Sequence, residues 1–341
     1  MYDKIILFPI ILLIVNFFLI KLKLLVDDPD ESFHKIEKKS GTPLSGGIYI
    51  ILSIIFISIF NLETLFKFNL SIFLILIFVL GIFADIKKNF SPKFRIIFQL
   101  LIIASLVFIN NEILINKTNI EFLDLILQNQ IARFVFSVFC IITLLNGLNF
   151  MDGVNGLVSG YILSILIILN LIMFKSSNLF YYNDLILVFS VFFIFNIFGK
   201  SFFGDNGIYI SSILIAFLII NIINTNQNIS PIIAITLLWY PAIENLFTIM
   251  RRLFKNNLTY LPDKLHLHSL IFRKLEISFK SIPKNSKNTL AGLIINIFLI
   301  PKFILTYFYY DKSYYLGAVA LVYIFIYLIS YSLLLKNNNK V

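Results

Sequence analysis

The sequence is poor in the residues that soluble domains use for surfaces and chemistry. Its 341 residues include one cysteine, one tryptophan and three histidines, and only 13% are charged. A single cysteine, Cys140, excludes an intrachain disulfide, and its apolar surroundings give no sign of thiol chemistry. No polar stretch is long enough for a separate soluble domain, and the longest, about 251–288, is interpreted as a large loop. The sequence therefore predicts one domain over residues 1–341.

Hydrophobic residues are abundant instead. They make up 59% of the chain, and the mean hydropathy is +0.92, which is typical of an all-α polytopic membrane protein. A helix crosses the hydrocarbon layer in about 20 residues. On that measure we expect about eleven transmembrane helices, at 5–25, 44–60, 69–84, 94–109, 131–148, 156–174, 184–199, 208–224, 229–250, 289–310 and 314–335. The first lacks a cleavage site and the charge order of a signal peptide, so it is expected to be retained.

The basic residues predict which way the chain faces. With eleven spans, 21 of the 28 lysines and arginines fall in connections on one side of the membrane. Since positive charge stays in the cytoplasm, we expect the N-terminus outside and the C-terminus inside. This topology also accounts for the net charge of +10, so no nucleic-acid partner is implied. All three histidines and most aspartates fall in the predicted cytoplasmic connections.

The most unusual stretch is 146–157, with the sequence NGLNFMDGVNGL, between two apolar runs. Its glycines permit a tight turn and a close approach of the backbone to a ligand. Asp152 and the asparagines offer oxygen ligands to a hard cation such as Mg²⁺. A solvated turn between two helices is the simpler alternative.

Similar polar turns recur at the predicted cytoplasmic level. Asp85 ends the third span, and Asp205 lies between glycines after Lys200. Gly46 and Gly47 begin the second span after a serine, where backbone N–H groups are predicted to approach a phosphate. Each has a simple alternative as an interfacial aspartate or an ordinary turn. Their repetition at one membrane level favours a common site.

The last large loop adds histidines. His266 and His268 follow Asp263, and their spacing of two does not place both on one helix face, which argues against a helical zinc pair. In an extended segment the imidazoles are predicted to contact phosphate oxygens, with a structural role as the alternative. Glu244, inside the preceding span, is interpreted as either a functional carboxylate or a partner in a helix–helix hydrogen bond.

These motifs, in this order, resemble the polyprenyl-phosphate N-acetylhexosamine-1-phosphate transferase family. Residues 146–157 are similar to the family's N-x-x-N-x-x-D-G-x-D-G-L, and residues 200–207 are similar to its K-x-F-x-G-D-x-G. Residues 263–268, DKLHLH, resemble its D-R-x-H-x-H. The chain departs from the family at Ala84, where an aspartate pair is usual, and at Asn155, which replaces an aspartate.

The resemblance implies a reaction and its parts. A UDP-N-acetyl amino sugar and polyprenyl phosphate would give polyprenyl-diphospho-sugar and UMP, with Mg²⁺ or Mn²⁺, on the cytoplasmic face of a bacterial inner membrane. The implied metal ligands are Asp205, Asp152 and Asp85. The implied catalytic residues are Asp85, Asp152, His266 and His268, and the implied substrate-binding residues are Asn149, Asn155, Lys200 and Asp263.

The sequence is compatible with two other functions. Ala84 and Asn155 are also compatible with a membrane scaffold or regulator that has lost catalysis. A transporter is the other alternative, and it predicts charged residues near mid-membrane on several helices. Membrane lipids surround the chain in every case, and a homodimer is left open as its assembly.

Overall fold

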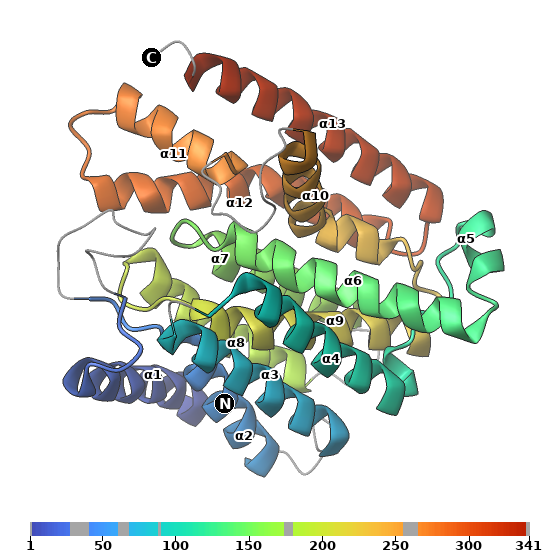
Figure 1. Ribbon diagram of the computed structural model, residues 1–341, viewed down its shortest axis with the longest axis horizontal. Helices are drawn as coiled ribbons and strands as arrows, with labels where there is room; N and C mark the ends of the chain where they lie inside the picture. Colours follow the sequence, from blue (N-terminus) through green and yellow to red (C-terminus); the bar gives the residue numbers. More distant parts are fainter. Residues whose placement is uncertain are drawn as a thin grey trace.

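The protein was analysed as a computed structural model that describes residues 2–27, 41–60, 68–87, 90–173, 180–254 and 265–338. These ranges are almost entirely helical (Figure 1). The helices are α1 (Tyr2–Leu22), α2 (Gly46–Phe60), α3 (Phe68–Ile86), α4 (Pro92–Ile109), η1 (Asn111–Ile113), α5 (Glu121–Ile126), α6 (Gln130–Met151), α7 (Leu157–Met173), α8 (Phe180–Ile197), α9 (Gly204–Thr225), α10 (Ile233–Phe254), α11 (Leu267–Ser278), α12 (Lys284–Phe308) and α13 (Ser313–Asn338).

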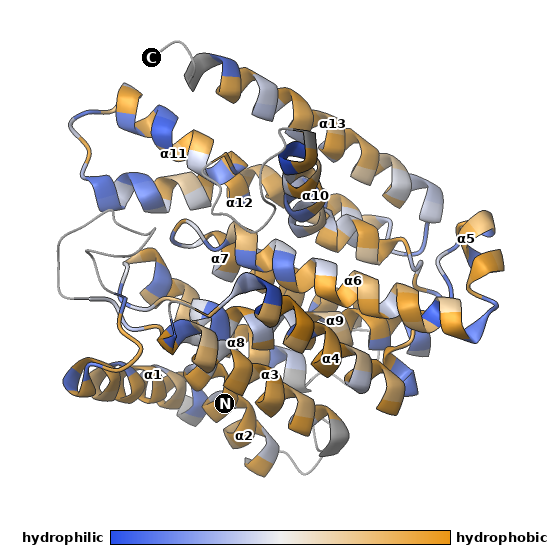
Figure 2. Cartoon of the chain, in the orientation of Figure 1, coloured by the Kyte–Doolittle hydropathy of each residue, from blue (hydrophilic) through white to orange (hydrophobic). Residues whose placement is uncertain are grey.

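Each predicted span coincides with one of these helices. By length and composition, seven helices in the described ranges can cross a membrane: α1, α4, α6, α9, α10, α12 and α13. Four others, α2, α3, α7 and α8, are also apolar, over described stretches of 10–17 residues. The helices are hydrophobic along their lengths, and hydrophilic residues collect near their ends and in the connections (Figure 2). The chain is therefore a helical polytopic membrane protein, as its composition indicates.

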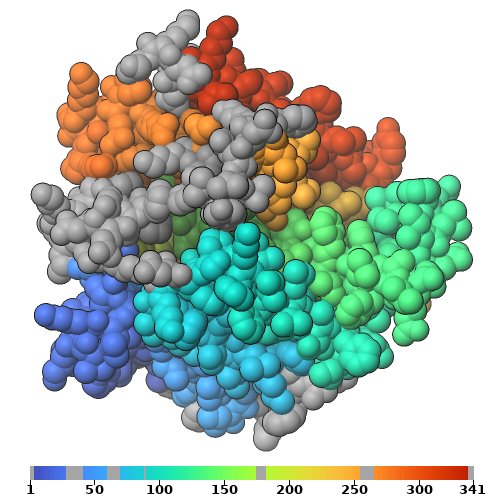
Figure 3. Space-filling view, viewed as in Figure 1, coloured from blue at the N-terminus to red at the C-terminus, as the bar shows by residue number. Residues whose placement is uncertain are grey.

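Helix α9 forms the centre of the molecule. Of the residues in its apolar stretch, 83% are buried, whereas only 22% are buried in the apolar stretch of α4 and 22% in that of α13. It packs against α2, α3 and α6, and α4 and α6 cover it on the face seen in Figure 3. Gly81 of α3 permits this close packing, since an added Cβ would lie 2.4 Å from the Cα of Asn206. A helix that is apolar on all sides is enclosed in this way by its neighbours.

The outer helices present apolar side chains to their surroundings. Phe108 on α4 is 78% exposed and Phe325 on α13 is 64% exposed. Exposed residues of this size, repeated along whole helices, fit contact with lipid chains rather than water. The core and the outer surface are therefore both hydrophobic, and the polar residues inside the bundle stand out.

The polar connections meet at one end of the bundle. An isolated bridge joins Val26 to Pro43, and Phe202 donates its N–H to the Pro43 carbonyl. Thr42 donates its hydroxyl hydrogen to the Gly199 carbonyl, which ties the first connection to the segment before α9. The α6–α7 turn and the start of α11 lie at the same end (Figure 1). These connections, which the sequence predicts on one side of the membrane, therefore lie together at one end of the bundle.

Candidate functional site

Asp85, at the end of α3, caps the start of α9. Its Oδ1 accepts the N–H of Asp205 at 2.8 Å, and its Oδ2 accepts the N–H of Asn206 at 3.0 Å. A carboxylate here satisfies N–H groups that have no partner within the helix, and it is stabilised by the helix dipole. Gly204 begins α9 with a φ of +65°, and an added Cβ would lie 2.8 Å from Asp85 Oδ2. Asp85 thus has a structural task, and its role as a metal ligand stays a prediction.

Asp205, in the first turn of α9, forms an ion pair with α4. Nη1 of Arg95 lies 2.5 Å from its Oδ2, and both side chains are largely shielded from solvent. Such a charge-assisted contact is among the stronger hydrogen bonds, and it holds the carboxylate in one orientation. Arg95 is a site residue that the sequence did not predict. In the sequence, Arg95 is a basic residue near the start of an apolar run. Basic residues are common at such positions, because they lie at the membrane interface.

Asn206 connects three segments at the start of α9. Its side-chain amide donates to Asp85 Oδ2 at 2.5 Å and to the Leu44 carbonyl at 3.2 Å. Its Oδ1 accepts the N–H of Gly47 at 2.7 Å, and the N–H of Gly46 donates to the Phe202 carbonyl. Both glycine N–H groups are used inside the protein, so the phosphate cradle predicted there does not form. The glycines serve packing instead, since a Cβ at Gly47 would lie 2.2 Å from Asn206 Oδ1.

The first half of the α6–α7 turn has few internal hydrogen bonds. Asp152 directly follows α6, and no hydrogen bond from the described part of the chain reaches its carboxylate. Burial raises the pKa of Asp152 to about 7, and the charges of Asp205, Asp85 and Asp27 act in the same direction. The aspartates are therefore near enough to influence one another. Asn149, one turn earlier, also has a side chain that forms no hydrogen bond with the described residues.

The second half of the same turn is fixed by amide groups. Asn155 donates its N–H to Asn288 Oδ1 at 2.6 Å, and its side chain donates to Asn285 Oδ1 at 3.2 Å. Gly156, with a φ of +80°, donates its N–H to Asn196 Oδ1 at 2.8 Å. Asn155, predicted to bind substrate, is buried and bound to α12. The neighbours of Asn155 are the neutral amides of Asn285 and Asn288, and the chain has a neutral amide here where the family has an aspartate.

His266 is held by Glu244 of α10. Its Nδ1 lies 3.0 Å from Glu244 Oε2, and Glu244 Oε1 accepts the N–H of Leu267 at 3.2 Å. Glu244 has no exposed surface. A buried carboxylate on Nδ1 fixes the orientation of the imidazole and leaves Nε2 for another partner. The intramembrane carboxylate noted in the sequence thus supports a histidine 22 positions away, a link that the sequence did not reveal.

The histidines meet the α6–α7 turn. The rings of His266 and His268 stack with centroids 5.4 Å apart and planes at 5°, and the Phe150 ring lies 5.4 Å from that of His266. An added Cβ at Gly153 would lie 2.2 Å from His268 Nε2, so only glycine permits this contact beside Asp152. The structure therefore joins two motifs that are more than 100 residues apart.

The remaining predicted residues lie at the edge of this arrangement or outside it. Lys200 is exposed just before α9. Asp263 lies outside the described residues, as does His34 of the first connection. The guanidinium of Arg252 lies over Phe150, with Cζ 5.7 Å from the ring centroid, and adds a cation that was not among the predicted site residues.

The donor set fits a magnesium or manganese ion only in part. In the described ranges, no three His, Cys, Asp or Glu side chains are arranged as ligands of one ion. Mg²⁺, however, is commonly held by one or two carboxylates, with substrate phosphates and water completing its shell. Asp152 supplies a carboxylate without a hydrogen bond in a field of other aspartates, and a divalent cation would offset that repulsion. Asp152 and Asp205 are the residues that fit this task.

Comparison with known proteins agrees with this geometry. Residues 67–223 match the model of glycosyl transferase family 4, and no curated protein matches the chain. The matched segment contains Asp85, Asp152 and Asp205, but it ends before Glu244 and the histidines. It supports the assignment of a membrane-bound transferase. Through this segment, which is just under half of its length, the chain is similar to glycosyl transferase family 4.

Proposed function

We propose that the protein transfers an N-acetylhexosamine-1-phosphate from a UDP-sugar to polyprenyl phosphate and releases UMP. The observation that carries the proposal is the contact of His268 with Gly153, beside Asp152, at the end of the bundle. It brings carboxylates and imidazoles together where a soluble nucleotide and a lipid phosphate can both arrive. The product would start a lipid-linked glycan on the cytoplasmic face of a bacterial inner membrane.

The reaction needs little covalent work from the protein. An oxygen of the lipid phosphate attacks the phosphorus nearer the sugar, a new P–O bond forms, and the bond to UMP breaks. A phosphate monoester is already an anion near neutral pH, so the attack does not require a dedicated base. Catalysis then depends on positioning and charge stabilisation. This supports activity without an aspartate at Ala84.

The side chains divide this work. Asp152 and Asp205 would hold Mg²⁺ or Mn²⁺, which when bound neutralises charge on the diphosphate. His266, oriented by Glu244, and His268 would bind phosphate oxygens. Asn149 and Lys200 would contact the nucleotide sugar. Arg95 holds Asp205 in place from α4.

A transfer assay tests the proposal. Purified protein is incubated with polyprenyl phosphate, Mg²⁺ and radiolabelled UDP-GlcNAc or another UDP-HexNAc, and lipid-linked label and released UMP are measured. We expect both products in equal amounts with at least one donor. Their absence across the donors, from folded protein, would contradict the proposal and favour a scaffold. Mass spectrometry of the lipid product identifies the sugar.

The variant that tests the proposed metal site most directly is Asp152→Asn rather than Asp205→Asn. Replacing Asp205 also removes the partner of Arg95, so loss of activity would mix catalysis with stability. Asp152 forms no side-chain hydrogen bond with the described residues, so its replacement tests the charge itself.

A further inference from the structure

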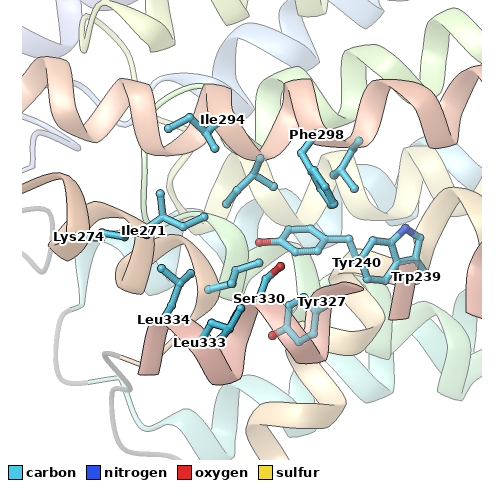
Figure 4. Close-up of a pocket in the computed structure, with 13 residues that line it drawn as sticks. Trp239, Tyr240, Ile271, Lys274, Ile294, Phe298, Tyr327, Ser330, Leu333 and Leu334 are labelled. Carbon is cyan, nitrogen blue, oxygen red and sulfur yellow. The ribbon is translucent and has the colours of Figure 1, made fainter. Parts of the chain in front are cut away.

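A second feature lies away from the carboxylates. A cavity of about 310 Å³ is lined by residues of α10, α11, α12 and α13 (Figure 4). Trp239 lies at one end of the view, Lys274 lies at the other, and aliphatic and aromatic side chains such as Ile271 and Phe298 line the length between them. The four helices are all outside the segment matched to the family.

The size and lining of the cavity exclude the nucleotide sugar as its occupant. Its volume is at the low end of small-molecule sites, which are about 300–1,000 Å³. The lining is almost entirely apolar, whereas a diphosphate needs several converging polar groups. A water molecule also needs two to four polar partners. A hydrocarbon chain fits such a lining, and the surrounding bilayer supplies chains.

The charged end of the cavity indicates the head group. Between 265 and 288 the chain carries five lysines and arginines and one acid, Glu276, whose Oε1 lies 4.0 Å from Nζ of Lys284. Lys274 is exposed at the cavity and forms no ion pair with the described residues. Basic residues at a membrane surface attract anionic head groups. An anionic lipid therefore complements both the apolar length and the cationic end.

A wall separates this cavity from the histidines. Tyr240 and Leu267 line the cavity, and both also contact Glu244 Oε1, Tyr240 through its hydroxyl at 3.4 Å and Leu267 through its N–H. Glu244 in turn holds His266. Tyr240, Leu267 and Glu244 thus connect a lipid chain in the cavity with the imidazole of His266. Its phosphate at Lys274 is a poor position for a reacting group.

We propose that this cavity binds one acyl chain of an anionic membrane phospholipid, with the head group at Lys274. The lipid is a resident of the site and not the substrate. The proposal is independent of the transfer reaction, because it depends only on the lining of the cavity and on the charge at its end.

The single tryptophan of the chain provides the test. Trp239 lines the cavity and is only 4% exposed, so its fluorescence reports a chain inside the cavity better than lipid around the protein. The full-length protein is reconstituted in phosphatidylcholine vesicles, and brominated phosphatidylglycerol or brominated phosphatidylcholine is added in steps. Bromine quenches tryptophan only at short range.

We expect phosphatidylglycerol to quench Trp239 at about fivefold lower mole fraction than phosphatidylcholine, the effect of one lysine near an anionic head group. Lys274→Gln should remove this preference, and Lys280→Gln, a matched exposed lysine that does not line the cavity, should keep it. Ser330→Phe should fill the cavity and reduce quenching by both lipids.

Three outcomes would overturn the proposal. The first is equal quenching by the two lipids in the unaltered protein, and the second is a preference that Lys274→Gln does not change. The third is relief of the phosphatidylglycerol quenching by stoichiometric polyprenyl phosphate, which would assign the cavity to the substrate. Since no turnover is measured, failure here is distinct from failure of the transfer assay.

Discussion

The two halves of the candidate site are built differently. The carboxylate half, on α3, α4 and α9, lies within the segment matched to the family, and the ion pair and Asn206 connect it on several sides. The histidine half, on α10 and α11, lies outside that segment and depends on one buried carboxylate, Glu244. The α6–α7 turn lies between them and carries Asp152. Asp152, whose carboxylate forms no hydrogen bond with the described residues, therefore lies between two groups that are each held by hydrogen bonds or ion pairs.

The largest effect should come from Asp152, in the turn between the halves. Asp152→Asn removes a charge that would hold the metal, so we expect transfer to fall about 10³-fold, the loss seen when an electrostatic stabiliser is removed. The melting temperature should not fall, because the carboxylate forms no hydrogen bond with the described residues. Transfer rate and thermal unfolding are measured together. Activity above a tenth of the unaltered protein would contradict the assignment.

The histidine half should respond next. Glu244→Gln replaces the carboxylate that orients His266 with an amide of the same shape, and we expect a 10–100-fold loss of transfer, as for other orienting partners. Tyr240→Phe is the control, because its hydroxyl contact with Glu244 is long, at 3.4 Å, and should contribute little. Equal rates for the two variants would show that the pair has no role in transfer.

The carboxylate half should respond in stability. Asn206→Ala leaves the buried N–H of Gly47 without its acceptor and removes the side-chain contacts to Asp85 and Leu44. We expect the free energy of unfolding to fall by about 1–3 kcal/mol. Asn149→Ala should leave it unchanged, since that side chain makes no hydrogen bond with the described residues. Chemical denaturation in detergent measures the free energy of unfolding of both variants. An equal decrease in the two would contradict the structural role assigned to Asn206.

The smallest effect should be a pH dependence of the metal-free protein. Because the pKa of Asp152 is raised to about 7, the folded protein binds more protons than the unfolded chain between about pH 4 and 7. Stability should therefore decrease as the pH rises through this window. Asp152→Asn should reduce this slope, and Mg²⁺ should oppose the loss at high pH. Melting temperatures with chelator or Mg²⁺ measure it, and identical slopes for the two proteins would exclude Asp152 as the cause.

Local patterns predicted the helices well. Continuous apolar runs located each apolar helix, because the need to satisfy every backbone group in lipid acts on each segment by itself. Helix α11 was instead included in the large loop. Its twelve residues mix Arg273, Lys274 and Glu276 with apolar side chains, and it packs against α12 and α13. Such a short helix depends on its neighbours for stability.

Residue types predicted which side chains lie together better than they predicted the contacts of single residues. The carboxylates and histidines were expected at one level of the membrane, and they lie at one end of the bundle. Gly46 and Gly47 were assigned to phosphate, but they serve the packing of α2 on α9. The sequence does not distinguish these uses of glycine, because both require a close approach of a backbone, and only the neighbour decides which it is.

Lys302 illustrates the same limit. It lies within α12, fully buried, with its Nζ 3.8 Å from the centroid of the Phe303 ring and near Tyr161 and Trp239. Aromatic faces surround the amine, and no hydrogen-bond partner is present in the described part of the chain. The neighbours of this lysine are therefore aromatic, an environment that the sequence did not predict.

The sequence by itself determined that this chain is a helical membrane protein with acidic, amide and histidine side chains collected in its polar connections. Hydrophobic length and residue chemistry are properties of each segment, so they can be read in order along the chain. Only the tertiary structure decided that Glu244 orients His266, that Asp85 caps α9 and that Asn155 is bound to α12. Those pairings join residues far apart in sequence, and they depend on which helices pack together in three dimensions.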